Sequence, residues 1–326
     1  MRKYFNFINF RTLVQVFFVA TSFNIGWKFI NYFKYIETAG LSGTAFRPPA
    51  VEAFVPLSAL VGMRAWLGTG MWDYVHPAGL TIFLTAILVS FLFRKSFCSW
   101  ICPFGFLEEL LGRVSRKFRP RKLNMPKWPD RVLRSVKYIL LGLFIGSIFF
   151  GMSAEAAAAF LEIPYNKLVD IQMLRFFLNI SLTGILVFSF LIVMSVLFDH
   201  FWCRYLCPYG ALLGLVGWIS PSRISRHTDL CINCGACDKT CTGHLKVSSA
   251  KNIISPECNG CLNCIESCPV SGALEFNFLG KLGGMKYLLP AAMLVVFASA
   301  IMWAKTTGHW ESSVTLQEVF TFFPMF

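Results

Sequence analysis

Five apolar stretches, each long enough to cross a lipid bilayer, constrain this 326-residue chain more than any other feature. A hydrocarbon core about 30 Å thick requires roughly 17–25 apolar residues in a helix. The five stretches are Leu13–Ile30, Pro77–Phe93, Tyr138–Ala154, Phe176–Phe198 and Leu282–Ala304. Only 14% of the residues are charged, whereas a soluble chain carries roughly 25%. The sequence therefore predicts an α-helical integral membrane protein with about five transmembrane helices.

The distribution of basic residues predicts the orientation, because cytoplasmic loops of membrane proteins are enriched in lysine and arginine. Much of the net charge of +13 comes from residues 94–137, whereas the loop between the third and fourth stretches has little beyond Lys167 and Arg175. We therefore expect the N-terminus and residues 94–137 and 199–281 to be cytoplasmic, and the C-terminal tail to be periplasmic. Apart from this net positive charge, nothing in the sequence indicates nucleic-acid binding.

Residues 50–67 are the ambiguous segment of the chain. They are apolar but include Glu52, Pro56 and Arg64, and Pro49 precedes them. A sixth span is one interpretation. We favour an interfacial or re-entrant helix on the outer surface, because a sixth span would reverse the sides of the cysteine-containing loops.

Eight of the twelve cysteines form two copies of the spacing C-x2-C-x2-C-x3-C, the second followed by Pro269. Three closely spaced thiolates can hold one corner of a cubane cluster, while the fourth ligates the neighbouring cluster. This predicts one [4Fe–4S] cluster at Cys231, Cys234, Cys237 and Cys268, and a second at Cys258, Cys261, Cys264 and Cys241. A pair of zinc sites is the alternative, but zinc favours two C-x2-C pairs at a longer separation.

Two details refine the expected turns of this segment. Gly235 and Gly260 lie between ligands, where the backbone must approach sulfur closely. Thr242 follows Cys241 at the position where the second copy has proline. We expect this threonine to alter hydrogen bonding to sulfur and thereby the cluster potential.

The other four cysteines belong to a repeated motif, FCSWICPFG from Phe97 and WCRYLCPYG from Trp202. Aligning the two copies superimposes a set of identical residues: Cys98/Cys203, Cys102/Cys207, Pro103/Pro208, Gly105/Gly210, Leu107/Leu212 and Gly112/Gly217. Each copy follows an apolar stretch, so the repeated unit is a span plus its motif. Two such units packed about a pseudo-two-fold axis would bring four thiols together.

The chemistry of this four-cysteine site is left open by the sequence. Residues four apart share a helix face, so each copy is expected to present two thiols from one helix, with proline ending that helical turn. Four converging thiolates suit an iron–sulfur cluster, Cu(I) or zinc, and nearby basic residues favour the thiolate. The interpretations are a metal centre, foremost a third iron–sulfur cluster or a copper site; a redox-active dithiol; or cysteines that only pack at helix ends.

The paired CxxxCP motifs, HPAGL (His76–Leu80), FWCRYLCPYGALLG (Phe201–Gly214) and the two-cluster segment resemble the polyferredoxin-type 4Fe–4S membrane proteins of the NapH, NosR and CcoG kind. The resemblance covers residues 11–274. It implies an electron-transfer subunit of the bacterial inner membrane, such as a quinol dehydrogenase subunit. Such a subunit connects the quinone pool with a periplasmic or membrane-bound oxidoreductase or a cytochrome. The CcoG-like members imply the alternative, a copper-reducing or metalloenzyme-maturation factor.

Taken together, these features predict five sequence segments. They are spans 1–2 with the outer segment (1–93), the basic loop with the first CxxxCP (94–137), spans 3–4 with the second CxxxCP (138–220), a small α+β two-cluster ferredoxin domain on the cytoplasmic side (221–281), and span 5 with an outer tail (282–326). The bilayer, the quinone pool and other redox subunits are the expected partners.

The histidines and nearby acids give weaker candidates. Asp73 and His76, with Glu52 and Arg64, could supply the polar groups of a quinone site, or could serve only as interfacial anchors and ion pairs. His200 and His227 lie near the inner cysteines and could ligate a metal, although surface histidines are commoner. Because all five histidines lie outside the span cores, we expect no haem between the spans.

Overall fold

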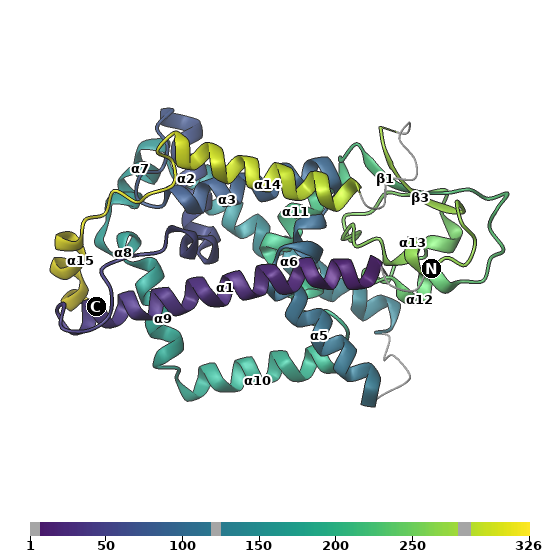
Figure 1. The fold of residues 1–326 in the computed structure, drawn as a ribbon, viewed down its shortest axis with the longest axis horizontal. Coiled ribbons are helices and arrows are strands. Elements are labelled where there is room, and N and C mark those ends of the chain that lie inside the picture. The colour runs from purple at the N-terminus through teal and green to yellow at the C-terminus, as the bar shows by residue number, and fades with distance from the viewer. Residues whose placement is uncertain (1–6, 119–124, 280–287) are drawn as a thin grey trace. The chain divides into compact units, whose positions relative to one another are not determined.

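The computed structural model describes residues 7–118, 125–279 and 288–326 (Figure 1). These residues form two compact units. Unit 1 comprises residues up to 19, 86–141 and 188–297, and unit 2 comprises 20–85, 142–187 and 298–326. The predicted start of the fifth span at Leu282 lies outside the described residues. Both units are predominantly helical, as the composition predicts.

Three helices of the described chain are long and apolar enough to cross a membrane. They are α1 (Phe7–Glu37), α6 (Lys127–Ile145) with its continuation through the π-helical turn Gly146–Phe150, and α14 (Leu288–Thr306). The third predicted span therefore lies earlier in the chain than expected. Helix α3 (Pro77–Phe93) is a shorter apolar helix of 17 residues, which gives a length of about 25 Å. The protein is thus a membrane protein, while the count of five spans stays a prediction.

The fourth predicted span is not one continuous helix, which corrects the sequence interpretation. It consists of α9 (Val169–Leu178) and α10 (Leu182–Leu197), and the two helices meet at an angle of 86°. The Oγ atom of Ser181 accepts a hydrogen bond from the amide of Gly184 at 3.2 Å. Serine competes with the helical backbone in this way and favours a helix start, so a new helix begins after the break.

Residues 50–67 form a short interrupted element and not a sixth span. The 3₁₀ turn Pro49–Phe54 is followed by α2 (Pro56–Thr69), and Gly70 ends α2 with a φ of 75°. At 14 residues α2 is too short to cross a bilayer. Within unit 2 it packs along α7 (Ala154–Glu162), and its residues Ala59 and Leu60 are buried.

Residues 222–278 carry a small antiparallel sheet with the strand order β2–β1–β3. Strand β1 (Ser222–Arg226) pairs with both β2 (Asn252–Ile253) and β3 (Leu274–Phe278). Ile224 faces Ile253 on one side and Phe276 on the other, and all three side chains are buried. With α12 (Ala236–Thr240) and α13 (Asn263–Glu266), the sheet makes the α+β segment that the sequence predicts.

The remaining elements are short. The other α-helices are α4 (Ser96–Trp100), α5 (Pro103–Phe118), α8 (Pro164–Lys167), α11 (Pro208–Trp218) and α15 (Leu316–Phe322). Further turns are the π-helical Trp202–Leu206 and the 3₁₀ turns Val247–Ser249 and Phe323–Met325.

Candidate iron–sulfur centres

The two CxxxCP copies adopt the same local structure, which differs from the predicted one. The first cysteine of each copy lies in a short helical turn, either α4 or Trp202–Leu206. The second cysteine, Cys102 or Cys207, directly precedes a new helix that starts with proline. Proline suits this first helical position because its missing N–H needs no partner there. Of the two thiols of a copy, one therefore lies in a helical turn and the other directly before the next helix, so they do not share one helix face.

The thiols of both copies lie close together in unit 1, as the internal repeat predicts. Burial raises the pKa of Cys98 to about 12 and that of Cys102 to about 11. Burial also raises the pKa of Cys203, and the other three cysteines of the repeat are near enough to raise it further. The amide of Gly210 donates a hydrogen bond to Cys207 Sγ at 3.2 Å, and the amide of Gly105 does the same for Cys102.

Lys95 places a buried positive charge beside these four thiols. Its side chain is 4% exposed, and its Nζ atom lies beside Gly210 and the Cys207 sulfur. Burial alone would lower the pKa of Lys95, but Cys98 and Glu257 raise it to a net increase, so the lysine stays charged. A fixed cation stabilises thiolates or any anionic group that they hold. No motif in the sequence marks Lys95, although it precedes the first cysteine by three positions.

The first CxxxCP copy is also hydrogen-bonded to the ferredoxin segment. Ser99 Oγ donates to the carbonyl of Asn259 at 2.7 Å, and Trp100 Nε1 donates to the carbonyl of Gly260 at 3.1 Å. Arg94 adds a bond of 2.8 Å to the carbonyl of Ser255. Helix α4 is therefore fixed to the loop that carries the second set of ferredoxin cysteines.

A buried ion pair lies at the start of that loop. Both carboxylate oxygens of Glu257 accept hydrogen bonds from Lys137 Nζ, at 2.8 and 2.7 Å, and Tyr138 donates a third at 2.9 Å. Although burial would raise the pKa of Glu257, Lys137 and Lys95 lower it to a net decrease. Glu257 is therefore an anion held directly before Cys258.

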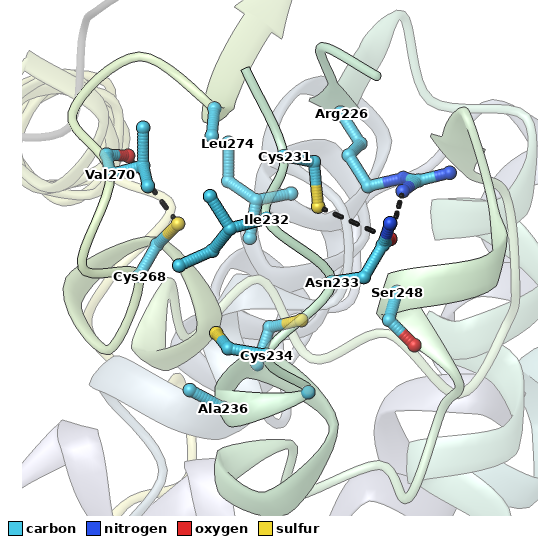
Figure 2. Close-up of a pocket in the computed structure, with 13 residues that line it drawn as sticks. Arg226, Cys231, Ile232, Asn233, Cys234, Ala236, Ser248, Cys268, Val270 and Leu274 are labelled. Carbon is cyan, nitrogen blue, oxygen red and sulfur yellow. Dashed lines mark hydrogen bonds between the residues drawn. The ribbon is translucent and has the colours of Figure 1, made fainter. Parts of the chain in front are cut away.

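One cavity in the ferredoxin segment is lined by Cys231, Cys234, Cys237 and Cys268 (Figure 2). These are the four cysteines that the sequence assigns to one cluster. The space between the surrounding atoms is about 360 Å³, part of it open to solvent. In the described chain, no three His, Cys, Asp or Glu side chains converge closely enough to hold a single metal ion. Thiols around a void fit a cubane cluster better than one zinc ion.

The cysteines predicted to hold the second cluster also lie close together. Burial raises the pKa of Cys241 to about 12, and Cys258 and Cys261 are near enough to raise it further. The pKa of Cys264 is raised in the same way, by burial and by these neighbouring cysteines. The hydroxyl of Thr242 lies 3.6 Å from Cys261 Sγ, so this threonine does contact sulfur, as its sequence position suggests.

The backbones of the two ferredoxin loops repeat each other. Gly235 and Gly260 both have positive φ angles, 68° and 59°, as expected between ligands. The equivalent positions of the other copy, Leu262 and Asn233, also have positive φ, 60° and 53°. Each loop thus has a left-handed residue before and after its second cysteine. Only the glycines were visible as a signal in the sequence.

His200 and His227, two of the histidines near the cysteines in sequence, do not lie in metal-binding surroundings in the described chain. His227 Nε2 lies 3.6 Å from a carboxylate oxygen of Glu275. Burial lowers the pKa of His200 to about 4, so this ring is neutral at pH 7. Neither belongs to a metal-binding group among the described residues.

Two family models match these regions of the chain. The one described as "4Fe-4S binding domain" matches residues 75–125 and 180–227, which contain the two CxxxCP copies. The one described as "4Fe-4S dicluster domain" matches residues 223–269. YccM of Escherichia coli K12 is 35% identical over 315 residues, which cover 95% of this chain and 88% of YccM. The chain belongs to the polyferredoxin-type 4Fe–4S protein family.

Two further relatives are less similar to this chain. The ferredoxin-type protein NapH of Haemophilus influenzae is 28% identical over 205 residues, 59% of this chain and 67% of NapH. Protein NirI of Paracoccus denitrificans is 29% identical over 208 residues, 62% of this chain and 29% of NirI. No solved structure matches the chain. As a member of this polyferredoxin family, the protein is an iron–sulfur electron-transfer protein of the membrane.

The two glycines of the repeat should respond differently to alanine. A Cβ atom on Gly105 would lie 1.9 Å from the carbonyl oxygen of Cys98, whereas one on Gly210 would meet its nearest atoms at 3.4 and 3.5 Å. We expect Gly105→Ala to lower the free energy of unfolding by about 1–3 kcal/mol. Gly210→Ala should be neutral or stabilising, because alanine favours a helix over glycine by about 1 kcal/mol. Thermal unfolding of both variants in detergent tests this, and equal midpoints would contradict it.

Proposed function

We propose that the protein relays electrons between the quinone pool and a partner oxidoreductase through three iron–sulfur centres. Two are the [4Fe–4S] clusters of the ferredoxin segment, and the third is held by Cys98, Cys102, Cys203 and Cys207. The observation that carries the proposal is the bonding of α4 to the loop at Asn259 and Gly260. It fixes the repeated motif against the ferredoxin segment, so that an electron has only a short distance to travel between them.

The residues around the sulfur atoms suit this role. Cys231, Cys234, Cys237 and Cys268 would hold one ferredoxin cluster, and Cys241, Cys258, Cys261 and Cys264 the other. When bound, such clusters supply reversible one-electron transfer. Lys95 stabilises negative charge at the four-cysteine centre, and the amides of Gly105 and Gly210 donate hydrogen bonds to its sulfur atoms.

We place the protein in the bacterial inner membrane, with its N-terminus and all twelve cysteines on the cytoplasmic side. The excess of lysine and arginine in residues 94–137 supports this orientation. A hydrocarbon core of about 30 Å would separate inner centres from a periplasmic partner. Quinone, which diffuses within the bilayer, or a cofactor of a neighbouring subunit would bridge that distance.

Stopped-flow oxidation tests the relay directly. Protein in lipid nanodiscs is reduced anaerobically and mixed with a water-soluble quinone analogue. We expect the reduced clusters to be oxidised rapidly by the quinone. Oxidation by ferricyanide provides the control, because it requires no quinone site. Clusters that react with ferricyanide but not with quinone would contradict the proposal.

A further inference from the structure

A group of buried charged side chains lies in unit 2, away from all the cysteines in sequence. Glu52, His76 and Asp170 have fully buried side chains, and that of Arg47 is 11% exposed. Asp73 is also buried, at 1% exposure. Ionisable side chains are rarely buried in a membrane protein unless they have a function or a partner. Of the sequence-predicted set, Arg64 does not belong here, because its guanidinium lies over the Phe149 ring.

The hydrogen bonds of His76 fix where its proton can be gained. His76 Nε2 lies 2.7 Å from the carbonyl oxygen of Asn166, which can only accept, so this nitrogen carries a hydrogen. The other nitrogen, Nδ1, is therefore the one that gains or loses a proton. It lies 3.5 Å from Glu52 Oε1, and while it carries no proton it accepts a hydrogen bond from Arg47 Nη2 at 3.4 Å.

Glu52 offers an acceptor that is not yet used. Its Oε2 atom accepts a hydrogen bond from the amide of Gly79 at 3.0 Å. Its Oε1 atom is buried and has no hydrogen-bond partner. A buried carboxylate oxygen without a hydrogen bond is costly, and a proton between it and His76 Nδ1 removes that cost.

The charges of the group also require a proton. Arg47 is the cation, and its guanidinium donates to Asp170 at 2.9 Å and to Ser312 at 3.1 Å. Its distance to Glu52 is longer, 3.6 Å. Arg47 and Asp170 thus neutralise each other, and Glu52 is left as an uncompensated buried anion unless His76 is charged.

We propose that Glu52 and His76 form a proton-binding site, which holds one exchangeable proton between Glu52 Oε1 and His76 Nδ1. The charged groups that face this proton site are Arg47, which lies in the loop before the 3₁₀ turn of Glu52, Asp170 at the start of α9, and Asp73. Asp73 Oδ1 accepts the amides of Val75 and His76, both at 2.9 Å. Burial would lower the pKa of His76, but Glu52 raises it to a net increase.

This site goes beyond the proposed function and does not depend on it, because the side chains that hold its proton all belong to unit 2.

Nitrogen NMR of the full chain, labelled with [15N]histidine in nanodiscs, tests the site without quinone. His76→Gln assigns the signal. We expect Glu52→Gln to lower the pKa of His76 by about one unit or more, because the opposite charge is lost. Glutamine can still accept the Gly79 amide, so the fold should persist, as an unchanged iron content would show. Glu155→Gln, an exposed acid of α7, is the matched control and should leave the titration unchanged. An unchanged titration in Glu52→Gln would overturn the proposal.

Discussion

Anaerobically purified protein is expected to contain about twelve irons per chain, and the double variant Cys98→Ser/Cys203→Ser about eight. The reason is the grouping of the thiols in three sets of four within unit 1. Each [4Fe–4S] cluster accounts for four irons, and the variant removes one thiol from each CxxxCP copy. Chemical analysis of iron and acid-labile sulfide measures the loss, and EPR of the reduced protein should lose one component.

The matched control is Cys231→Ser/Cys234→Ser, which removes two thiols from the ferredoxin cavity of Figure 2. It should also lower the iron content by about four, but with loss of a different EPR signal. About eight irons in the wild type would show that the CxxxCP copies hold no cluster. Copper that is bound to that protein and lost in Cys98→Ser/Cys203→Ser would then favour the metal-reducing or maturation function.

The parts of this site that follow from spacing could be predicted from sequence. The ferredoxin loops lie close together in the sequence, so the spacing of their cysteines suffices to propose a ligand set for each cluster. The CxxxCP copies are about a hundred residues apart, yet their internal symmetry predicts that the thiols meet. What spacing cannot predict is the turn around them, because Asn233 and Leu262 adopt positive φ without being glycine.

The buried ion pairs of the protein could not be predicted from residue spacing. Arg47 meets Asp170, and Lys137 meets Glu257, across more than a hundred residues of sequence. No local pattern marks such a pair, since each member alone resembles an ordinary loop or helix charge. By sequence, Arg64 was an equally good candidate for the buried charged group of Arg47, Glu52 and His76. The break in the fourth span was hidden for a different reason, because apolar runs lie on both sides of Asn179 and Ser181 and together have the length of one span.

Replacing Lys137 by methionine is expected to lower the free energy of unfolding by about 3 kcal/mol. The side chain of Lys137 is fully buried, and it donates to both oxygens of Glu257. Without it, Glu257 remains as a buried anion with only Tyr138 and the nearby Lys95 to stabilise it. Denaturant unfolding of the full chain in mild detergent measures the difference from the wild type.

The double variant Lys137→Met/Glu257→Leu separates an unpaired charge from lost packing. Removing both charges leaves no buried anion, so it should recover most of the stability that Lys137→Met loses. If the double variant is as unstable as the single one, packing and not charge explains the loss. Glu257→Leu alone leaves Lys137 unpaired and should be destabilised as well.

The pH dependence provides an independent check on the same pair. Because the folded-state pKa of Glu257 is lowered, its stabilising contribution is present above the unfolded value of about 4.3. It is lost as the pH falls through the folded-state pKa. In Lys137→Met the pKa of Glu257 should rise, because the strongest opposing charge is gone. The stability gap between wild type and Lys137→Met should therefore narrow as the pH is lowered from 7 toward 4. A gap that stays constant over this range would show that the Glu257 charge does not cause the instability.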